Sequence, residues 1–320
     1  MFGMALQTDV VQTMIRRRKE REEIRQWKKG YYHLSTDGWK EGRLFHTASQ
    51  YAYGMIVMGL VTLLFDVKIY SFSLMPNHVH MILSGTGAAC LDVFDYLRQK
   101  FSDRLIKDGY PALPDDYWFK LVPIEDEQQM KNVFIYVDRN AYEKQISVPC
   151  GYTWSSGPLH YSLLGTLLTG QRADTFSKRK LIEMTGSSKP IPPDWEFHPA
   201  IGLLPGSFVD NRLFLRLFKS PKEYESRLVK DYEAFVQVAR TLDEVPDYSE
   251  EDYVIIVDQM LERKFSGRGL WQLSNEEKGR LAVDLMKNYD MSVPQIAQAI
   301  KMSEHMVRQF LRAKDFGHQR

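Results

Sequence analysis

Two imidazoles stand two residues apart in the segment Leu74–Leu83, which reads Leu-Met-Pro-Asn-His-Val-His-Met-Ile-Leu. On a β-strand, residues i and i+2 project to the same face. His78 and His80 can therefore bind one metal ion together, while Val79 points into a core. The alternative is a strand whose histidines only satisfy local hydrogen bonds.

A second candidate group lies on a helix that we expect to begin after Asp126, with that residue as N-cap and Gln129 at N3. At about 100° per residue, Tyr136 and Asn140 fall one turn apart on the edge of its apolar stripe. Tyr142 points about 120° away from Tyr136. Taken alone, such a pair is more often a boundary aromatic residue and a surface polar residue. The apolar stripe consists of Met130, Val133, Phe134, Val137 and Ala141.

Two neutral imidazoles and one amide oxygen make an incomplete metal-binding shell, which leaves positions open for water and phosphate oxygens. Such a shell suits Mg²⁺ or Mn²⁺ acting as a Lewis acid on a phosphodiester. A tyrosine hydroxyl has an ordinary pKa of about 10. It therefore needs a nearby cation and a positioned phosphate to act as a nucleophile.

Together the two patterns resemble the HUH endonucleases, in which His-hydrophobic-His on a strand is followed by a helix with Tyr-x-x-x-Asn. Within that group the chain is similar to the single-tyrosine transposases of small bacterial insertion sequences. Ser73–His80 resembles the REP-associated tyrosine transposase branch, and Gly151–Ser156 resembles its Tyr-x-Trp-Ser-Ser segment. The resemblance covers residues 28–160. It departs at 140–144, where many relatives read Asn-Pro-Val-Arg-Ala and this chain reads Asn-Ala-Tyr-Glu-Lys.

The resemblance implies a metal-dependent transposase or nuclease that acts on single-stranded or hairpin DNA. It implies that His78, His80 and Asn140 hold one Mg²⁺ or Mn²⁺, and that Tyr136 attacks a DNA phosphate. The products would be a 5′-phosphotyrosine link, which stores the energy for strand transfer, and a free 3′-OH. The resemblance leaves open whether the tyrosine helix serves its own subunit or a partner's, so a homodimer is one expected assembly.

The expected fold class is α+β, and the elements that position these residues follow the order β-α-β-β-α-β. This is the ferredoxin-like pattern with an antiparallel sheet, as the HUH resemblance also implies. Its third strand lies inside the sheet, so the histidines would stand on a rigid platform. The expected elements are strand 31–35, helix 47–65, strands 68–74 and 78–83, helix 91–107 and strand 118–124.

The carboxy-terminal segment has the spacing of a helix-turn-helix. A helix over 275–289 is followed by helices capped by Ser292 and Ser303. Arg308, Arg312 and Lys314 lie along the last helix, where they suit phosphate or base-edge contacts. The alternative is a small helical bundle used for protein contact.

Length and breaker residues divide the chain into three expected segments. They are an HUH domain over 1–160 with a basic arm over 1–28, a linker and helical region over 161–248, and the helix-turn-helix domain over 249–320. The arm carries Arg16, Arg17 and Arg18, which either track phosphates or form a solvated helical face.

Composition adds few constraints. The formal net charge is +1, so support for nucleic-acid binding must be local. The uncharged stretch 47–65 fits a helix packed on a sheet better than a membrane span. Two cysteines and no apparent signal peptide predict a reduced cytoplasmic setting, here associated with the nucleoid.

Two other function classes remain. A regulator with a catalytically degenerate HUH domain could clamp a DNA hairpin, but it would not need His78, His80, Tyr136 and Asn140 together. A purely structural metal-binding domain leaves the tyrosine unexplained.

Overall fold

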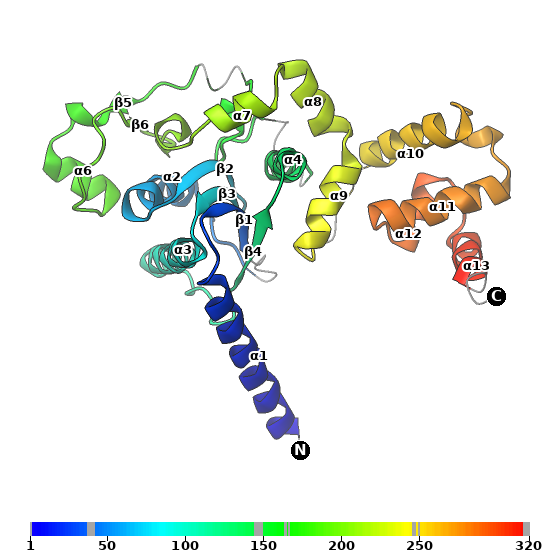
Figure 1. Ribbon diagram of the computed structural model, residues 1–320, viewed down its shortest axis with the longest axis horizontal. Helices are drawn as coiled ribbons and strands as arrows, with labels where there is room; N and C mark the ends of the chain where they lie inside the picture. Colours follow the sequence, from blue (N-terminus) through cyan, green and yellow to red (C-terminus); the bar gives the residue numbers. More distant parts are fainter. Residues whose placement is uncertain are drawn as a thin grey trace. The chain divides into compact units, whose positions relative to one another are not determined.

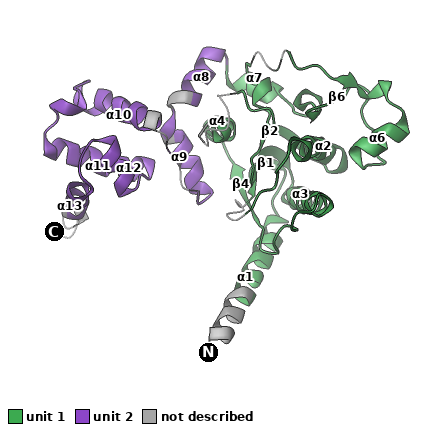
Figure 2. Ribbon diagram, turned by 180° about the vertical axis from the view of Figure 1, so that it is seen from behind, with its two compact units in different colours: residues 1–141, 147–218 green, residues 142–146, 219–320 purple. Residues whose placement is uncertain are grey.

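The chain divides into two compact units (Figure 2). One comprises residues 1–141 and 147–218, and the other comprises 142–146 and 219–320. All four residues of the predicted chemistry belong to the first unit. The computed structural model describes residues 2–36, 42–143, 150–162, 165, 167–244, 248 and 250–315.

A four-stranded antiparallel sheet forms the centre of the first unit, with strand order β2-β3-β1-β4. The elements follow in the predicted order β-α-β-β-α-β, so the mixed α+β class is confirmed. β3 and β1 are the inner strands, and Ser35 of β1 pairs with His80 of β3. The bounds are β1 Gly30–Thr36, α2 Ala48–Leu64, β2 Lys68–Leu74, β3 Val79–Gly85, α3 Gly87–Lys107, β4 Phe119–Ile124 and α4 Glu127–Glu143.

The two faces of this sheet differ in polarity. Leu34, Phe72 and Met81 are fully buried in the core that α2 and α3 complete. Strand alternation sends the residues between them to the opposite face. Figure 1 shows α2 and α3 on one side of the sheet and α4 on the other. The polar residues on the α4 side are nevertheless buried, and they are His33, Ser35, Ser71, Ser73 and His80.

Local capping explains where the covering helices begin. Thr47 accepts a hydrogen bond from the Gln50 amide and starts α2. The predicted N-cap of α4 is confirmed, because Asp126 Oδ1 accepts from the Gln129 amide at 2.7 Å.

Among the described residues, no helix combines the length and the apolar character that a membrane crossing requires.

Residues 171–218 extend the first unit beyond the predicted end at residue 160. This range was expected to hold a linker and helices, but it also contains a three-stranded sheet of very short strands. It packs on α2, where a side chain at Gly59 would collide with Leu203. Strands this short show no readable alternation, so the sequence did not indicate them. The elements that follow α4 in this unit are η1 Gly157–Leu159, β5 Gln171–Arg172, η2 Ala173–Thr175, α6 Lys178–Thr185, β6 Glu196–His198, β7 Gly202–Leu203, η3 Pro205–Ser207 and α7 Arg212–Leu217.

The second unit is helical over its described residues. Of its last three helices, α11 has the predicted bounds, and α12 and α13 begin directly after the predicted caps Ser292 and Ser303. Val307 of α13 is fully buried in their shared core. The side chain of Lys314 and residues 316–320 lie outside the described part. The elements are α8 Pro221–Lys230, α9 Tyr232–Thr241, α10 Glu250–Phe265, η4 Leu270–Gln272, α11 Asn275–Tyr289, α12 Val293–Ala299 and α13 Glu304–Asp315.

Candidate functional site

The two predicted histidines meet at the start of β3. The strand begins at Val79, one residue later than predicted. Just before it, the Met75 amide donates a hydrogen bond to the His78 carbonyl, which closes the turn between β2 and β3. The imidazoles still lie edge to face with ring centroids 4.7 Å apart. His80 is completely buried, whereas His78 retains 8% exposure. Any ligand must therefore reach the pair from the side of His78.

Asn140 reaches the histidines from α4. Its Nδ2 lies 3.0 Å from Nε2 of His80, and its side chain is buried. The amide nitrogen can only donate, so Nε2 of His80 is the acceptor in this contact. Rotation of the Asn140 amide by half a turn would place its oxygen, instead of its nitrogen, beside Nε2 of His80. The two ends of an amide have nearly the same size and shape, so both orientations fit the space.

Tyr136 lies one turn before Asn140 on the same face of α4. Its ring stands perpendicular to that of His80, with centroids 5.3 Å apart. Only 1% of Tyr136 is exposed. The structure thus brings together all four residues that the sequence singled out, from strand and helix segments about sixty residues apart in the chain.

His33 of β1 completes this cluster and was not predicted. Its ring lies 5.4 Å from that of His80 and 5.8 Å from that of Tyr136. Burial lowers the pKa of His33 to about 3, so the ring is neutral. Neither ring nitrogen has a hydrogen-bond partner among the residues that the structure describes. A buried unsatisfied polar group lowers the stability of the fold by about 1–3 kcal/mol. An apolar side chain would therefore fill this position in a purely structural core at lower cost.

The possible metal-binding donors are two imidazole nitrogens and one amide oxygen, a set that leaves coordination positions open. Burial, and then the neighbouring His78 and His33, hold the pKa of His80 well below its usual range, so its imidazole is a neutral ligand. No three His, Cys, Asp or Glu side chains in the described part of the chain converge as a metal site. A cation here would depend on two imidazoles and the Asn140 oxygen, with water or phosphate completing the shell.

A second buried polar pair anchors α4 from behind. Asp138 lies between Tyr136 and Asn140, and its Oδ2 is 2.5 Å from Nδ1 of His160. Both side chains are completely buried. The His160 ring also stacks on Phe214 of α7 at 3.9 Å. The pair ties the tyrosine helix to the segment that follows it.

We expect His160→Ala to lower the free energy of unfolding by about 3–5 kcal/mol, because it leaves the Asp138 carboxylate buried without its imidazole. Urea denaturation followed by circular dichroism would measure the change. His46→Ala is the matched control, since His46 is exposed, and it should change stability by no more than about 0.5 kcal/mol. Equal effects of the two substitutions would show that the Asp138 pair does not anchor the helix.

The predicted basic arm forms helix α1, Phe2–Ile24, and is partly engaged within its own unit. The Arg17 guanidinium bonds the Asp116 carbonyl at 2.8 Å and lies over the Trp118 ring. Arg18 forms an ion pair with Glu22 within the helix. Arg16 and Arg18 are exposed, so of the three arginines Arg17 is the least suited to track phosphates.

The predicted arginines of the second unit are exposed on α13. Arg308 forms an exposed ion pair with Glu304 one turn earlier, and Arg312 follows one turn later on the same side. Val307, which precedes Arg308 in the sequence, faces the core. This helix therefore presents a polar surface opposite its packed one.

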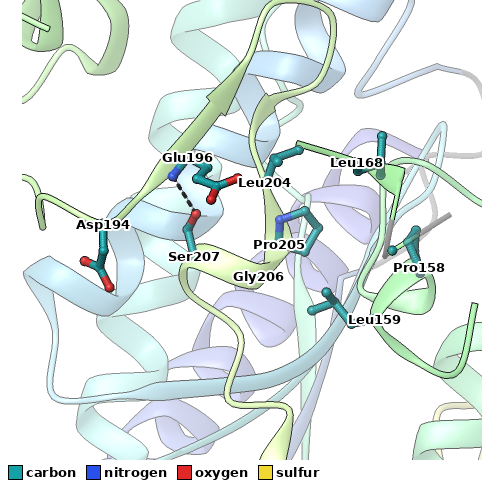
Figure 3. A pocket seen from close by; sticks show the side chains of 10 residues that line it. Pro158, Leu159, Leu168, Asp194, Glu196, Leu204, Pro205, Gly206 and Ser207 are labelled. Carbon is teal, nitrogen blue, oxygen red and sulfur yellow. Dashed lines mark hydrogen bonds between the residues drawn. The ribbon is translucent and has the colours of Figure 1, made fainter. Parts of the chain in front are cut away.

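A separate cavity of about 210 Å³ opens elsewhere in the first unit (Figure 3). Figure 3 shows the Glu196 carboxylate and the hydroxyl of Ser207, whose Oγ accepts from the Glu196 amide at 2.8 Å. Leu159 and Leu204 line the same space. Of the predicted site residues that the structure describes, none borders this cavity.

Comparison with known proteins finds one distant structural likeness. No protein-family model matches the sequence, and a search of curated proteins finds no match. A solved structure of a REP-associated tyrosine transposase bound to a REP hairpin is similar over 42% of this chain and 82% of that one. The sequence identity is 15% and the TM-score is 0.34. A likeness of this extent does not assign the chain to a family.

Proposed function

We propose that this protein is a metal-dependent transposase or nuclease that cuts single-stranded DNA near a hairpin. The observation that carries the proposal is the meeting of Tyr136 and Asn140 with His80 beneath α4, beside His78. A core needs no such set, because four polar or ionisable side chains cost more to bury than apolar ones. The strand order, with the histidine strand inside the sheet, supports a ferredoxin-like HUH domain.

His78, His80 and Asn140 would hold one Mg²⁺ or Mn²⁺, which when bound supplies Lewis-acid polarisation of the scissile phosphate. Tyr136 then acts as the nucleophile. Its Oη forms a bond to phosphorus, the phosphorus–O3′ bond breaks, the phenol loses its proton and the departing 3′-oxygen gains one. The product is a 5′-phosphotyrosine whose bond energy is kept for rejoining or transfer.

The experiment that tests this function is formation of a covalent adduct. Labelled hairpin oligonucleotides with randomised single-stranded flanks are incubated with the full chain and Mn²⁺, then separated on a denaturing protein gel. Radiolabel that migrates with the protein only when Mn²⁺ is present supports the proposal. Binding of the same DNA without any adduct contradicts it.

One observation favours a second candidate. Tyr136 is only 1% exposed, so in this arrangement DNA cannot reach its hydroxyl without movement of a covering segment. A DNA-hairpin-binding regulator that has lost catalysis would need no such movement. Binding without adduct formation, with and without divalent cation, would favour this candidate.

We propose that α11, α12 and α13 form a helix-turn-helix that supplies DNA affinity, with α13 as the recognition helix. The double substitution of Arg308 and Arg312 by alanine should weaken DNA binding. It should also reduce the slope of log K against log salt by about one for each phosphate that the variant no longer neutralises. Fluorescence anisotropy at several salt concentrations measures both effects.

Lys180→Ala is the control for this double variant, because Lys180 forms a similar exposed pair with Glu183 on α6, outside the three helices. It should leave both the affinity and the salt slope close to those of the wild type. An unchanged slope in the double variant would refute the assignment of α13.

A further inference from the structure

Three buried ring nitrogens in the candidate site have no hydrogen-bond partner within the described part of the chain. They are Nδ1 and Nε2 of His33 and Nδ1 of His80. His33 is 1% exposed and His80 is completely buried, so bulk water does not solvate these atoms. Buried polar atoms are almost always paired in folded proteins, and three exceptions on two adjoining rings call for a physical reason.

With the Asn140 amide oriented as the structure has it, nitrogen toward His80, the contact selects one tautomer of His80. Asn140 Nδ2 donates to His80 Nε2 at 3.0 Å, so Nε2 carries no hydrogen. The neutral ring must then carry its hydrogen on Nδ1, and that nitrogen becomes a buried donor. The same tautomer is the one that leaves Nε2 available to a metal ion.

His33 is the side chain placed to accept this hydrogen. It lies on β1, next to β3 in the sheet, with its ring centroid 5.4 Å from that of His80 and the planes inclined by 36°. On the same face, Ser73 Oγ is directed elsewhere, since it donates to the Met75 sulfur. A small movement of the two rings, or one bridging water, would satisfy a nitrogen of each.

We propose that His33 is a positioning residue that accepts the Nδ1 hydrogen of His80 and so holds His80 in the tautomer that presents Nε2 to a divalent cation. Metal-binding histidines are commonly oriented in this way by a hydrogen bond to their other ring nitrogen. The inference rests on the metal site of the proposed function, but it does not depend on the DNA chemistry. His33 also contacts Tyr136, so the same ring packs against both the ligand and the nucleophile.

The test compares the full-length wild type with His33→Phe, which keeps a ring but removes both nitrogens. Long-range ¹H–¹⁵N spectra of the metal-free proteins report the tautomer of each histidine, and isothermal titration with Mn²⁺ reports affinity. We expect His80 to be a single Nδ1–H tautomer in the wild type and a mixture in His33→Phe. The Mn²⁺ affinity of the variant should be about 10–100-fold lower.

His33→Gln offers an amide acceptor in place of the imidazole, and it should recover most of the affinity and the single tautomer. His46→Phe is the control, because His46 is exposed and stacks on Tyr110, and it should change neither readout. If His33→Phe fails to fold, the inference is still tested by the His80 tautomer in the wild-type spectrum and by the Mn²⁺ affinity of His33→Gln.

An unchanged tautomer or an unchanged Mn²⁺ affinity in His33→Phe would overturn the inference. So would a wild-type protein in which His80 carries its hydrogen on Nε2, or one that binds no Mn²⁺. A wild type that binds Mn²⁺ and responds to His33→Phe, yet links to no DNA, would leave the inference standing while the proposed function fails.

Discussion

Tyr136→Phe should abolish covalent attachment to DNA and reduce strand cleavage by at least about 10³-fold, as removal of an enzyme nucleophile does. Phenylalanine keeps the ring that packs against His80 and His33, so the protein should fold and bind Mn²⁺ like the wild type. Any loss of stability should be about 1 kcal/mol, the usual net value of one hydrogen bond. The adduct assay on a denaturing gel and a thermal melt measure these effects.

Tyr142→Phe is the control for this substitution. Tyr142 lies on the same helix but about 120° away from Tyr136 around its axis, and its side chain is outside the described part of the structure. It should retain both adduct formation and cleavage. An adduct that persists in Tyr136→Phe and vanishes in Tyr142→Phe would overturn the assignment of the nucleophile.

His80→Ala should lower the affinity for Mn²⁺ by at least about 100-fold, more than the loss of an outer hydrogen-bond partner would. His80 is the centre of the cluster, because its ring contacts those of His78, His33 and Tyr136 and its Nε2 faces Asn140. Without it, the proposed ligand set retains only the imidazole of His78 and the amide of Asn140. Isothermal titration measures the affinity directly.

A thermal melt gives an independent measure of the same loss. A bound cation stabilises the native state by mass action, so saturating Mn²⁺ should raise the melting temperature of the wild type and leave that of His80→Ala unchanged. His46→Ala should behave like the wild type. Equal stabilisation of His80→Ala and wild type by Mn²⁺ would place the cation elsewhere.

Local signals in the sequence were sufficient for much of the site. The alternation of side chains along a strand predicted that His78 and His80 lie together, and helical periodicity predicted that Tyr136 and Asn140 lie on one face of their helix. Capping residues located the starts of α4, α12 and α13, because a cap acts within one turn of its own helix. These patterns depend only on neighbours in the sequence, which is why they could be predicted without the fold.

The remaining parts depend on which segments pair in three dimensions. His33 is a lone histidine on β1, and it joins the site only through the pairing of β1 with β3. His160 meets Asp138 from 22 residues further along the chain, with no spacing that signals the contact. The strands over 171–203 are two or three residues long, too short for their side chains to show a period.

The most direct test of the central claim is to identify the residue that becomes linked to DNA. Wild-type protein is trapped with a hairpin library in the presence of Mn²⁺, digested with trypsin, and the DNA-linked peptide is sequenced by mass spectrometry. We predict a nucleotide mass on the peptide 132–139, in which Tyr136 is the single tyrosine. A nucleotide on any other peptide, or protein that binds the library with no linked peptide at all, would contradict the account.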